Sequence, residues 1–330
     1  MKVIAVAGGT GHVGRPIVET LAESASFKVL VLGRKAPDET KGGLPVSTTY
    51  LQVDYANVEA LAHLLKQHNV HTLISTIQIT GETASSAQVN LISASDKSSA
   101  VKRFIISAWG ALPNEQYLPS ATICTRLPSA NASPRSPTAT FHAASIARLR
   151  QTNIEWTQFA VGFFLDYYGL PKIKTHLPML TFALDIANRE AAIPGTGDEA
   201  ISFTYTYDMA KFVAAFLKEP KWEELTVCYG ERTTWNKFLK VAEEVIGEPF
   251  QVTYDSAESL QRGEVTELPS HKTELAASSF PEVIARQLLA ILGMWAANGQ
   301  FDIRHKNSLN ARYPDIQPMT IQEMLLCGKE

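Results

Sequence analysis

A glycine-rich loop near the start of the chain has the spacing that binds diphosphates. Its sequence is Gly8-Gly9-Thr10-Gly11-His12-Val13-Gly14. Gly8 permits a tight turn, Gly11 lets the backbone approach a diphosphate, and Gly14 lets the next helix pack closely on the preceding strand. The first N–H groups of that helix then face the phosphates at the positive end of the helix dipole. The loop is therefore predicted to hold a dinucleotide through Gly8, Thr10, Gly11, His12, Val13 and Gly14.

A cation stands about twenty residues further on, at the place where an NAD-binding site has an acid. The second apolar run ends in Val31-Leu32-Gly33-Arg34-Lys35. A carboxylate at this place would bind the ribose hydroxyls, whereas a guanidinium pairs with phosphate oxygens. We predict that Arg34, helped by Lys35 or Lys41, holds the 2′-phosphate of NADP(H). The alternative is an ordinary exposed arginine at a strand end.

Polar residues that follow three further apolar runs are also assigned to the cofactor site. Asp54 follows the third run, where its carboxylate could accept a hydrogen bond from the adenine amine. The fourth and fifth runs end close to the path of the middle of a dinucleotide, and we assign Ser75, Thr76, Ile77, Ser107 and Ala108 there. Asp54 and the hydroxyl residues after the fourth run could equally serve as turn or cap residues.

The elements that must position these residues alternate along the first half of the chain. Apolar runs indicate strands over 3–7, 29–32, 49–53, 72–76, 104–107 and 155–161, and periodic segments indicate helices over 14–25, 58–67, 87–99 and 141–151. Continuous apolar strands are buried on both faces, and their alternation with helices implies a parallel sheet with right-handed crossovers. The predicted fold class is therefore α/β, a Rossmann-type doubly wound parallel sheet.

The chain is long enough for two domains. We predict an NADP-binding domain over residues 1–161 and a smaller α+β substrate-binding domain over 162–330, interleaved with the last strands of the sheet. Residues 112–139 are rich in Pro, Ser and Ala, which is typical of a loop or lid. The second half alternates helices such as 208–217 and 235–246 with short strands such as 225–229.

Composition favours a small-molecule partner. The net charge is −3 and the isoelectric point is near 6.3, so no strong field attracts nucleic acid or an anionic membrane. Cys124, Cys228 and Cys327 are too few and too scattered for a disulfide framework or a metal site. No apolar stretch approaches the roughly twenty residues of a membrane helix, and the chain enters a strand without a secretory signal. We therefore expect a cytoplasmic protein and leave a homodimer open.

Taken together, these residues resemble the NmrA-like and isoflavone-reductase-like branch of the atypical short-chain dehydrogenases. The resemblance covers nearly the whole chain and rests on the order and spacing of its pieces. Besides the glycine loop and Arg34, these are Arg103-Phe-Ile-Ile-Ser-Ala-Trp-Gly110, Ile154-Glu-Trp-Thr157, Gly162-Phe163-Phe164, Ile193-Pro-Gly-Thr-Gly197, Tyr207-Asp-Met-Ala210 and Thr234-Trp-Asn-Lys-Phe238. The resemblance implies NADP binding, a place in secondary metabolism, and an aromatic or polyketide-like small molecule in a cleft between two domains.

The resemblance also implies a catalytic lysine that this chain does not have. Family reductases place it at the start of the helix before the sixth strand, a position that falls on or near His142, and no lysine occurs between Lys102 and Lys172. An imidazole can donate or accept a proton near neutrality, so His142 is the candidate catalytic residue. The alternative is that His142 flanks a helix without a chemical role. The aromatic residues that follow the fifth and sixth strands are predicted to surround a flat substrate: Trp109, Phe163, Phe164, Tyr167 and Tyr168.

Three functions are compatible with this sequence. The first is an NADPH-dependent reductase of an aromatic or polyketide-derived carbonyl or enone, with the proton supplied by His142 or water. The second is a non-catalytic redox sensor that binds NADP(H) and acts through a protein partner, as some members of the family do. The third is an isomerase or cyclase that uses the same cleft.

Overall fold

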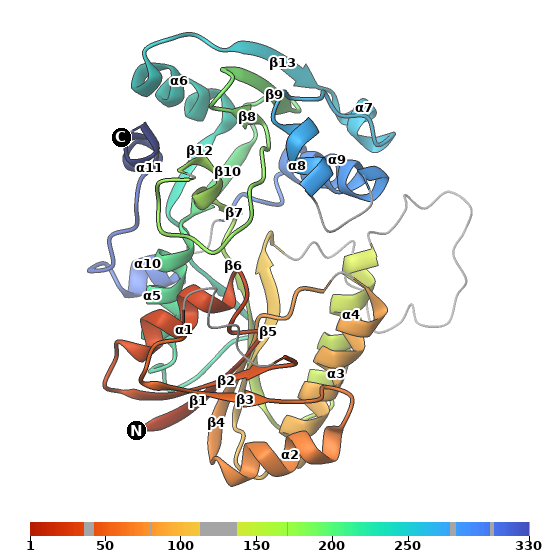
Figure 1. The fold of residues 1–330 in the computed structure, drawn as a ribbon, viewed down its shortest axis with the longest axis vertical. Coiled ribbons are helices and arrows are strands. Elements are labelled where there is room, and N and C mark those ends of the chain that lie inside the picture. Colours follow the sequence, from red (N-terminus) through yellow and green to blue (C-terminus); the bar gives the residue numbers. More distant parts are fainter. Residues whose placement is uncertain are drawn as a thin grey trace. The chain divides into compact units, whose positions relative to one another are not determined.

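The computed structural model describes residues 1–35, 43–79, 81–112, 137–169, 171–277, 282–303 and 307–329, and the chain divides into two compact units (Figure 1). The first unit contains Met1–Trp109, Pro113–Ala160 and Ala210–Thr226. The second contains Gly110–Leu112, Val161–Met209 and Val227–Glu330. The step from 160 to 161 lies next to the domain boundary predicted from sequence. Ala210–Thr226 returns to the first unit, so the two units are interleaved along the sequence.

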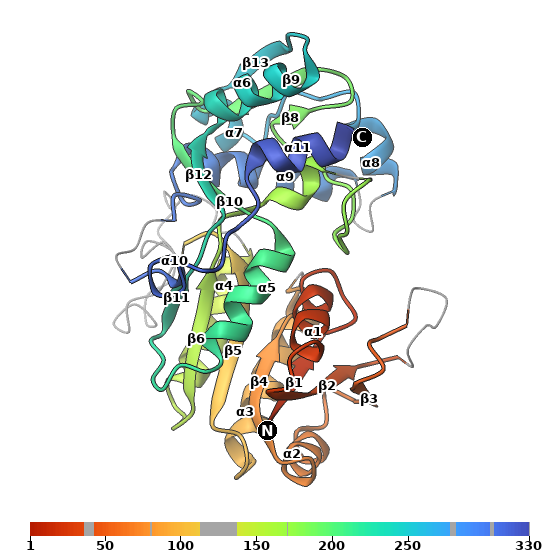
Figure 2. The ribbon, with the colours of Figure 1, turned by 90° about the vertical axis from the view of Figure 1, so that its left-hand side faces the viewer.

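The first unit is built on a seven-stranded sheet. Its strands are β1 (Lys2–Ala7), β2 (Phe27–Gly33), β3 (Thr48–Gln52), β4 (Val70–Ser75), β5 (Arg103–Gly110), β6 (Glu155–Ala160) and β11 (Leu225–Val227). They lie in the order β11-β6-β5-β4-β1-β2-β3, and β3–β2, β2–β1, β1–β4 and β4–β5 pair in parallel (Figure 2). The order of the first six strands is that of a Rossmann fold, which confirms the predicted fold class.

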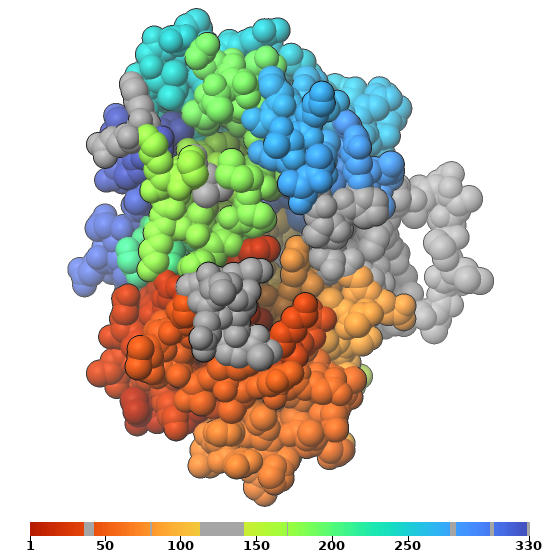
Figure 3. Space-filling view, in the orientation of Figure 1, coloured from red at the N-terminus to blue at the C-terminus, as the bar shows by residue number. Residues whose placement is uncertain are grey.

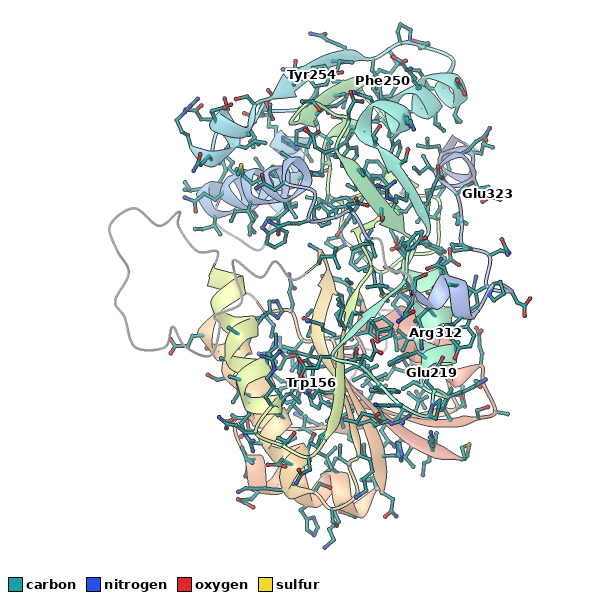
Figure 4. The ribbon with its side chains drawn as sticks, turned by 180° about the vertical axis from the view of Figure 1, so that it is seen from behind. Trp156, Glu219, Phe250, Tyr254, Arg312 and Glu323 are labelled. Atoms are coloured by element: carbon teal, nitrogen blue, oxygen red, sulfur yellow. The ribbon has the colours of Figure 1, made fainter. Side chains whose placement is uncertain are left out.

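Helices cover both faces of this sheet. Figure 1 shows α1 (Gly14–Ala22) and α5 (Thr206–Phe216) on one side and α2 (Val58–Gln67), α3 (Glu82–Lys97) and α4 (Pro137–Leu149) on the other. The apolar faces of α2, α3 and α4 pack on the sheet in one cluster that includes Leu65, Leu91 and Leu149, all fully buried. Full burial of such a side chain stabilises the fold by about 1.5–3 kcal/mol. Trp156 of β6, labelled in Figure 4, belongs to the same cluster.

The helix ends differ from the sequence expectation by a few residues. α2 has the predicted bounds, whereas α1 ends three residues early and α3 begins five residues early. α4 begins at Pro137, because proline is tolerated in the first turn, where its missing N–H has no helical partner. Residues 137–139 of the predicted lid thus belong to a helix, and 113–136 lie outside the described residues.

The second unit contains two three-stranded sheets and several helices. One sheet has the order β12-β10-β7 and the other β13-β9-β8. The strands are β7 (Phe163–Phe164), β8 (Leu184–Asp185), β9 (Glu190–Pro194), β10 (Ala200–Thr204), β12 (Glu231–Thr234) and β13 (Gln251–Asp255). The helices are α6 (Trp235–Ile246), α7 (Ala257–Gln261), α8 (His271–Ala277), α9 (Glu282–Ala297), α10 (Leu309–Arg312) and α11 (Ile321–Lys329). Among the described residues, no helix is long and apolar enough to cross a membrane.

Candidate functional site

The glycine loop between β1 and α1 adopts a backbone that needs glycine. Gly8 has a φ of +78°, its N–H donates to the Leu32 carbonyl at 3.0 Å, and its carbonyl accepts from the Gly11 N–H at 2.8 Å. A Cβ at Gly14 would lie 2.5 Å from the Gly8 carbonyl oxygen and 2.8 Å from the Gly9 Cα. Any side chain at Gly14 would therefore push the loop away from the helix, so the structure accounts for two of the three spaced glycines.

The N-terminus of α1 has no side-chain cap, although the Arg15 N–H donates to the Gly11 carbonyl at 2.9 Å. Its N-cap residue, Val13, makes no side-chain hydrogen bond, and the first turn of α1 has no acidic residue. By contrast, Asn57 caps α2 by accepting from the Ala60 N–H, and Glu59 lies in the first turn of α2. The first N–H groups of a helix need acceptors and carry about half a positive charge. A diphosphate fits this uncapped end, beside the exposed Thr10 and His12.

The predicted 2′-phosphate and adenine residues lie beside the ends of β2 and β3. Arg34 and Lys35 directly follow β2 and are exposed, whereas Lys41 lies outside the described residues. Most of residues 43–60, which include β3, lie at the surface of this unit, whereas Val53 and Tyr55 are buried (Figure 3). Asp54 is exposed, and its Oδ1 accepts from the Ala56 N–H at 2.9 Å. Asp54 thus forms a turn, and its contact with adenine stays a prediction.

The hydroxyl residues at the ends of β4 and β5 already donate to the backbone. The Thr76 hydroxyl and N–H both donate to the Ala7 carbonyl at 2.8 Å, and the Ser107 hydroxyl donates to the Ile77 carbonyl at 2.9 Å. Their oxygens retain the ability to accept hydrogen bonds. Near them, the Ser75 hydroxyl is buried with no hydrogen-bond partner among the described residues. These contacts fix the sheet edge on which a dinucleotide would lie.

Gln88 of α3 is a buried residue that sequence reasoning missed. Its Oε1 accepts from the Ser107 N–H at 2.9 Å, and its Nε2 donates to the Ser145 hydroxyl of α4 at 3.1 Å. One amide thereby links β5, α3 and α4. The available signal was periodicity, because Gln88 precedes the buried Leu91 and Ile92 by three and four residues and so lies on the same helix face.

His142 lies on α4, one turn before Ser145 and on the same face of the helix. It is the sixth residue of α4, whereas the predicted helix over 141–151 would make it the second, because α4 begins at Pro137. Its Nδ1 is buried with no hydrogen-bond partner among the described residues. Burial lowers the pKa of His142, so the neutral imidazole, with one donor and one acceptor nitrogen, is favoured.

The aromatic residues predicted to surround a substrate divide between the two units. Trp109, in the first unit, stacks on Phe159 with ring centroids 5.2 Å apart, and its Nε1 donates to the Ser75 carbonyl at 3.0 Å. Phe163, in the second unit, is 5% exposed and packs against Trp235 and other core rings, so it is a core residue and not the substrate contact that the sequence predicted.

The other predicted contacts have mixed environments. Phe164 and Tyr167 are half-buried, whereas Tyr168 is buried and its hydroxyl donates to the Phe182 carbonyl at 2.7 Å. Ile77 and Ala108 are half-buried against the apolar cluster under α2, α3 and α4. Thus Tyr168 is a core residue, while Phe164 and Tyr167 stay predictions.

Two other kinds of site find little support in the described part of the chain. There, no three His, Cys, Asp or Glu side chains converge as metal ligands would. The second unit has a cavity of ≈20 Å³ lined by Phe182, His271 and Leu289, among others. This volume suits a single water molecule and not an aromatic substrate.

Comparison with known proteins defines the class of this chain. Residues 8–175, half of the chain, match the family described as NAD(P)H-binding, and the chain belongs to this family. Oxidoreductase BOA1 of Botryotinia fuckeliana (strain B05.10) is 29% identical over 321 residues, with 96% of each chain covered. An isoflavone reductase homolog of Nicotiana glauca is 24% identical over 269 residues, with 78% of each covered. The resemblance to the isoflavone-reductase-like branch is thereby confirmed, and the chain is an oxidoreductase-family protein.

Solved structures show the same fold. The structure titled AtPrR2 with NADP+ and (+)pinoresinol has a TM-score of 0.71 to this chain at 17% identity, with 98% of each chain covered. The structure of an isoflavone reductase has a TM-score of 0.68 at 20% identity, again with 98% of each covered. The similarity therefore extends over both units and not the nucleotide-binding part alone.

Proposed function

We propose that this chain is an NADPH-dependent reductase of a small aromatic or polyketide-derived carbonyl or enone. The observation that carries the proposal is the glycine loop with its uncapped helix end, joined to Arg34 on the next strand. Relatives named as oxidoreductases and as an isoflavone reductase homolog support the reaction class. When bound, the dinucleotide supplies the hydride; the residues of this chain bind and orient it.

Arg34 gives the dinucleotide its phosphate preference in this proposal. A guanidinium can donate two parallel hydrogen bonds to phosphate oxygens, and NAD has no phosphate at that position. Backbone N–H groups around Val13, at the start of α1, hold the diphosphate, and Lys35 adds a positive charge nearby. The two phosphate-binding features, the glycine loop and Arg34, therefore follow two adjacent strands, β1 and β2.

His142 is the proposed proton donor, with water as the alternative. The neutral imidazole retains one N–H, which can donate a hydrogen bond to a developing oxyanion, and the imidazolium form can transfer a proton there and return to the neutral form. Because the pKa of His142 is lowered, the imidazolium form is scarce at neutral pH. We therefore expect activity to rise as the pH falls towards the pKa of His142, if proton transfer limits the rate.

The test is a screen for NADPH oxidation at 340 nm with aromatic ketones, enones and quinones. We expect turnover of at least one compound, and a loss of about 10²-fold or more in kcat for His142→Phe, which removes both nitrogens. Unchanged kcat in His142→Phe would assign the proton to water. Tight NADPH binding without any turnover across the panel would contradict a reductase.

A redox sensor is the second candidate, favoured by the absence of any lysine between Lys102 and Lys172. A sensor would bind NADP+ and NADPH with clearly different affinities and would retain a protein partner in one redox state. An isomerase or cyclase would instead convert its substrate without net loss of NADPH. Measuring product and 340 nm absorbance in the same reaction separates these functions.

A further inference from the structure

We propose that Tyr50, Gln52 and Tyr55 are positioning residues that set the preference for NADP over NAD, because they fix the backbone that carries Arg34. Two of them belong to β3, and Tyr55 lies three residues beyond its end. The inference rests on the proposed contact between Arg34 and the 2′-phosphate. It assigns a role to three side chains for which the cofactor site otherwise has none.

Four consecutive carbonyls at the end of β2 accept hydrogen bonds from the segment 50–55. The Tyr55 hydroxyl donates to the Leu32 carbonyl at 2.9 Å, and the Val53 N–H donates to the Gly33 carbonyl at 2.9 Å. The Gln52 Nε2 then donates to the Arg34 carbonyl at 3.1 Å, and the Tyr50 hydroxyl donates to the Lys35 carbonyl. Only the bond from Val53 to Gly33 joins two backbone groups. Beyond it, side chains of the segment 50–55 bind the backbone at Arg34 and Lys35, where the pairing of β2 with β3 has ended.

The absence of a side chain at Gly33 leaves room for the ring of Tyr50. A Cβ at Gly33 would lie 2.8 Å from the Cζ atom of the Tyr50 ring, so a side chain there would displace the ring. The ring of Tyr50 therefore crosses β2 at the residue that has no side chain, and its hydroxyl reaches the carbonyl two residues further on. Tyr50 itself is half-buried, and it lies on the edge strand of the sheet.

Tyr55 links this turn to the phosphate loop. Its side chain is 7% exposed, and the Leu32 carbonyl that accepts from its hydroxyl also accepts from the Gly8 N–H at 3.0 Å. The Asn90 side chain of α3 donates to the Tyr55 carbonyl at 3.0 Å and helps to fix the position of this residue. Burial raises the pKa of Tyr55, so its hydroxyl stays protonated and able to donate across the ordinary pH range.

A fixed backbone at Arg34 matters only for a ligand that has the 2′-phosphate. A paired guanidinium and phosphate require defined geometry, and a clamp held in place before binding avoids the entropy cost of ordering it on binding. The affinity for NAD does not benefit from the ordered backbone at Arg34, because NAD has no phosphate that Arg34 could bind. Loss of the three side chains should therefore weaken NADP+ binding selectively.

The experiment is a double-mutant cycle followed by calorimetric titration with NADP+ and NAD+. Both Tyr50 and Gln52 lie at the edge of the sheet, so Tyr50→Phe with Gln52→Ala should fold normally. We expect NADP+ affinity to fall about tenfold in this variant, which corresponds to the loss of one or two hydrogen bonds. NAD+ affinity should change less than about twofold. In an Arg34→Ala background the same two substitutions should have almost no further effect.

Tyr55→Phe tests the buried member, with Tyr254→Phe as the matched control. Tyr254 is an exposed tyrosine of the second unit whose hydroxyl donates to Asn236 at 3.0 Å (Figure 4). We expect a several-fold loss of NADP+ affinity for Tyr55→Phe and none for the control.

Two results separate this inference from the proposed function. Equal losses of NADP+ and NAD+ affinity, or equal losses with and without Arg34, would overturn the positioning role and leave Arg34 as the 2′-phosphate ligand. If Arg34→Ala itself left the preference for NADP+ unchanged, the 2′-phosphate assignment would fail first, and the positioning role with it.

Discussion

Two regions at the carboxyl ends of the strands in the first unit are built in different ways: the phosphate end, between β1 and α1, and the region near the end of β5. The phosphate end is formed by neighbours in sequence, the glycine loop and the start of α1, and its shape comes from backbone geometry. The end near β5 is formed by Gln88, Ser107 and Ser145, which come from three elements far apart in the chain. The difference teaches that binding depends here on local backbone shape, whereas the placement of His142 depends on buried side-chain contacts between elements.

The largest expected effect comes from a side chain at Gly14. In Gly14→Ala the new Cβ would meet the Gly8 carbonyl oxygen at 2.5 Å, so loop and helix must separate. We expect dinucleotide affinity to fall about 10- to 100-fold, since overpacking of this kind costs about 1–3 kcal/mol. The control is Gly81→Ala, where a Cβ meets nothing within 4 Å. Calorimetry below the unfolding temperature measures both, and equal affinities would show that the loop does not bind the phosphates.

Gln88→Leu tests the other side of the comparison. It leaves the buried Ser107 N–H without its acceptor, which should lower the free energy of unfolding by about 1–3 kcal/mol. Because α4 also loses its bond from Gln88, kcat should fall more than dinucleotide affinity. Urea unfolding and steady-state kinetics measure these effects, with the exposed Gln67→Leu of α2 as the control. A loss confined to dinucleotide affinity would place Gln88 at the phosphate end instead.

His142 should make stability depend on pH. Burial lowers its pKa below the ordinary 6.5, so the unfolded chain binds more protons than the folded chain as the pH falls below that value. The free energy of unfolding should therefore decrease from about pH 7 to about pH 5, and less steeply in His142→Gln. The exposed His63→Gln of α2 is the control. Identical pH slopes for wild type and His142→Gln would mean that the imidazole is solvated.

Lys35→Ala is expected to have the smallest effect. Lys35 is exposed, and an exposed charge contributes about 0.2–1 kcal/mol, so NADP+ affinity should fall less than about fivefold. The loss should shrink further with added salt. Lys28, an exposed lysine of β2, supplies the control Lys28→Ala. A loss as large as that for Arg34→Ala would make Lys35 an equal ligand of the phosphate.

The sequence predicted the phosphate end far better than the other end. Gly8, Gly11 and Gly14 carry their geometric requirements in their spacing, and the apolar runs predicted six strands of the sheet. The network of Gln88 could not be predicted, because a hydrogen bond between α3, α4 and β5 depends on how helices pack. Phe163 was misassigned for the same reason, since its aromatic type suits a pocket or a core and its contacts decide between them.

The contacts that fix the backbone at Arg34 were predictable from sequence only in part. The residue itself was predicted from its place after β2, whereas the contacts from Tyr50 and Gln52 require the register of β3 beside β2, in which Gly33 pairs with Gln52. A strand prediction places residues on an edge but does not give their register. The same limit applies to any side chain that acts across two strands.

The central claim is that the glycine loop and Arg34 together bind NADP(H). Calorimetric titration of the purified chain and of Arg34→Ala with NADP+ and NAD+ tests it most directly, with Arg150→Ala, another arginine at the surface of the first unit, as control. We predict that the unaltered chain binds NADP+ more tightly than NAD+, and that Arg34→Ala loses about 10- to 100-fold in NADP+ affinity with NAD+ affinity nearly unchanged. Failure of the unaltered chain to bind either dinucleotide would contradict the account.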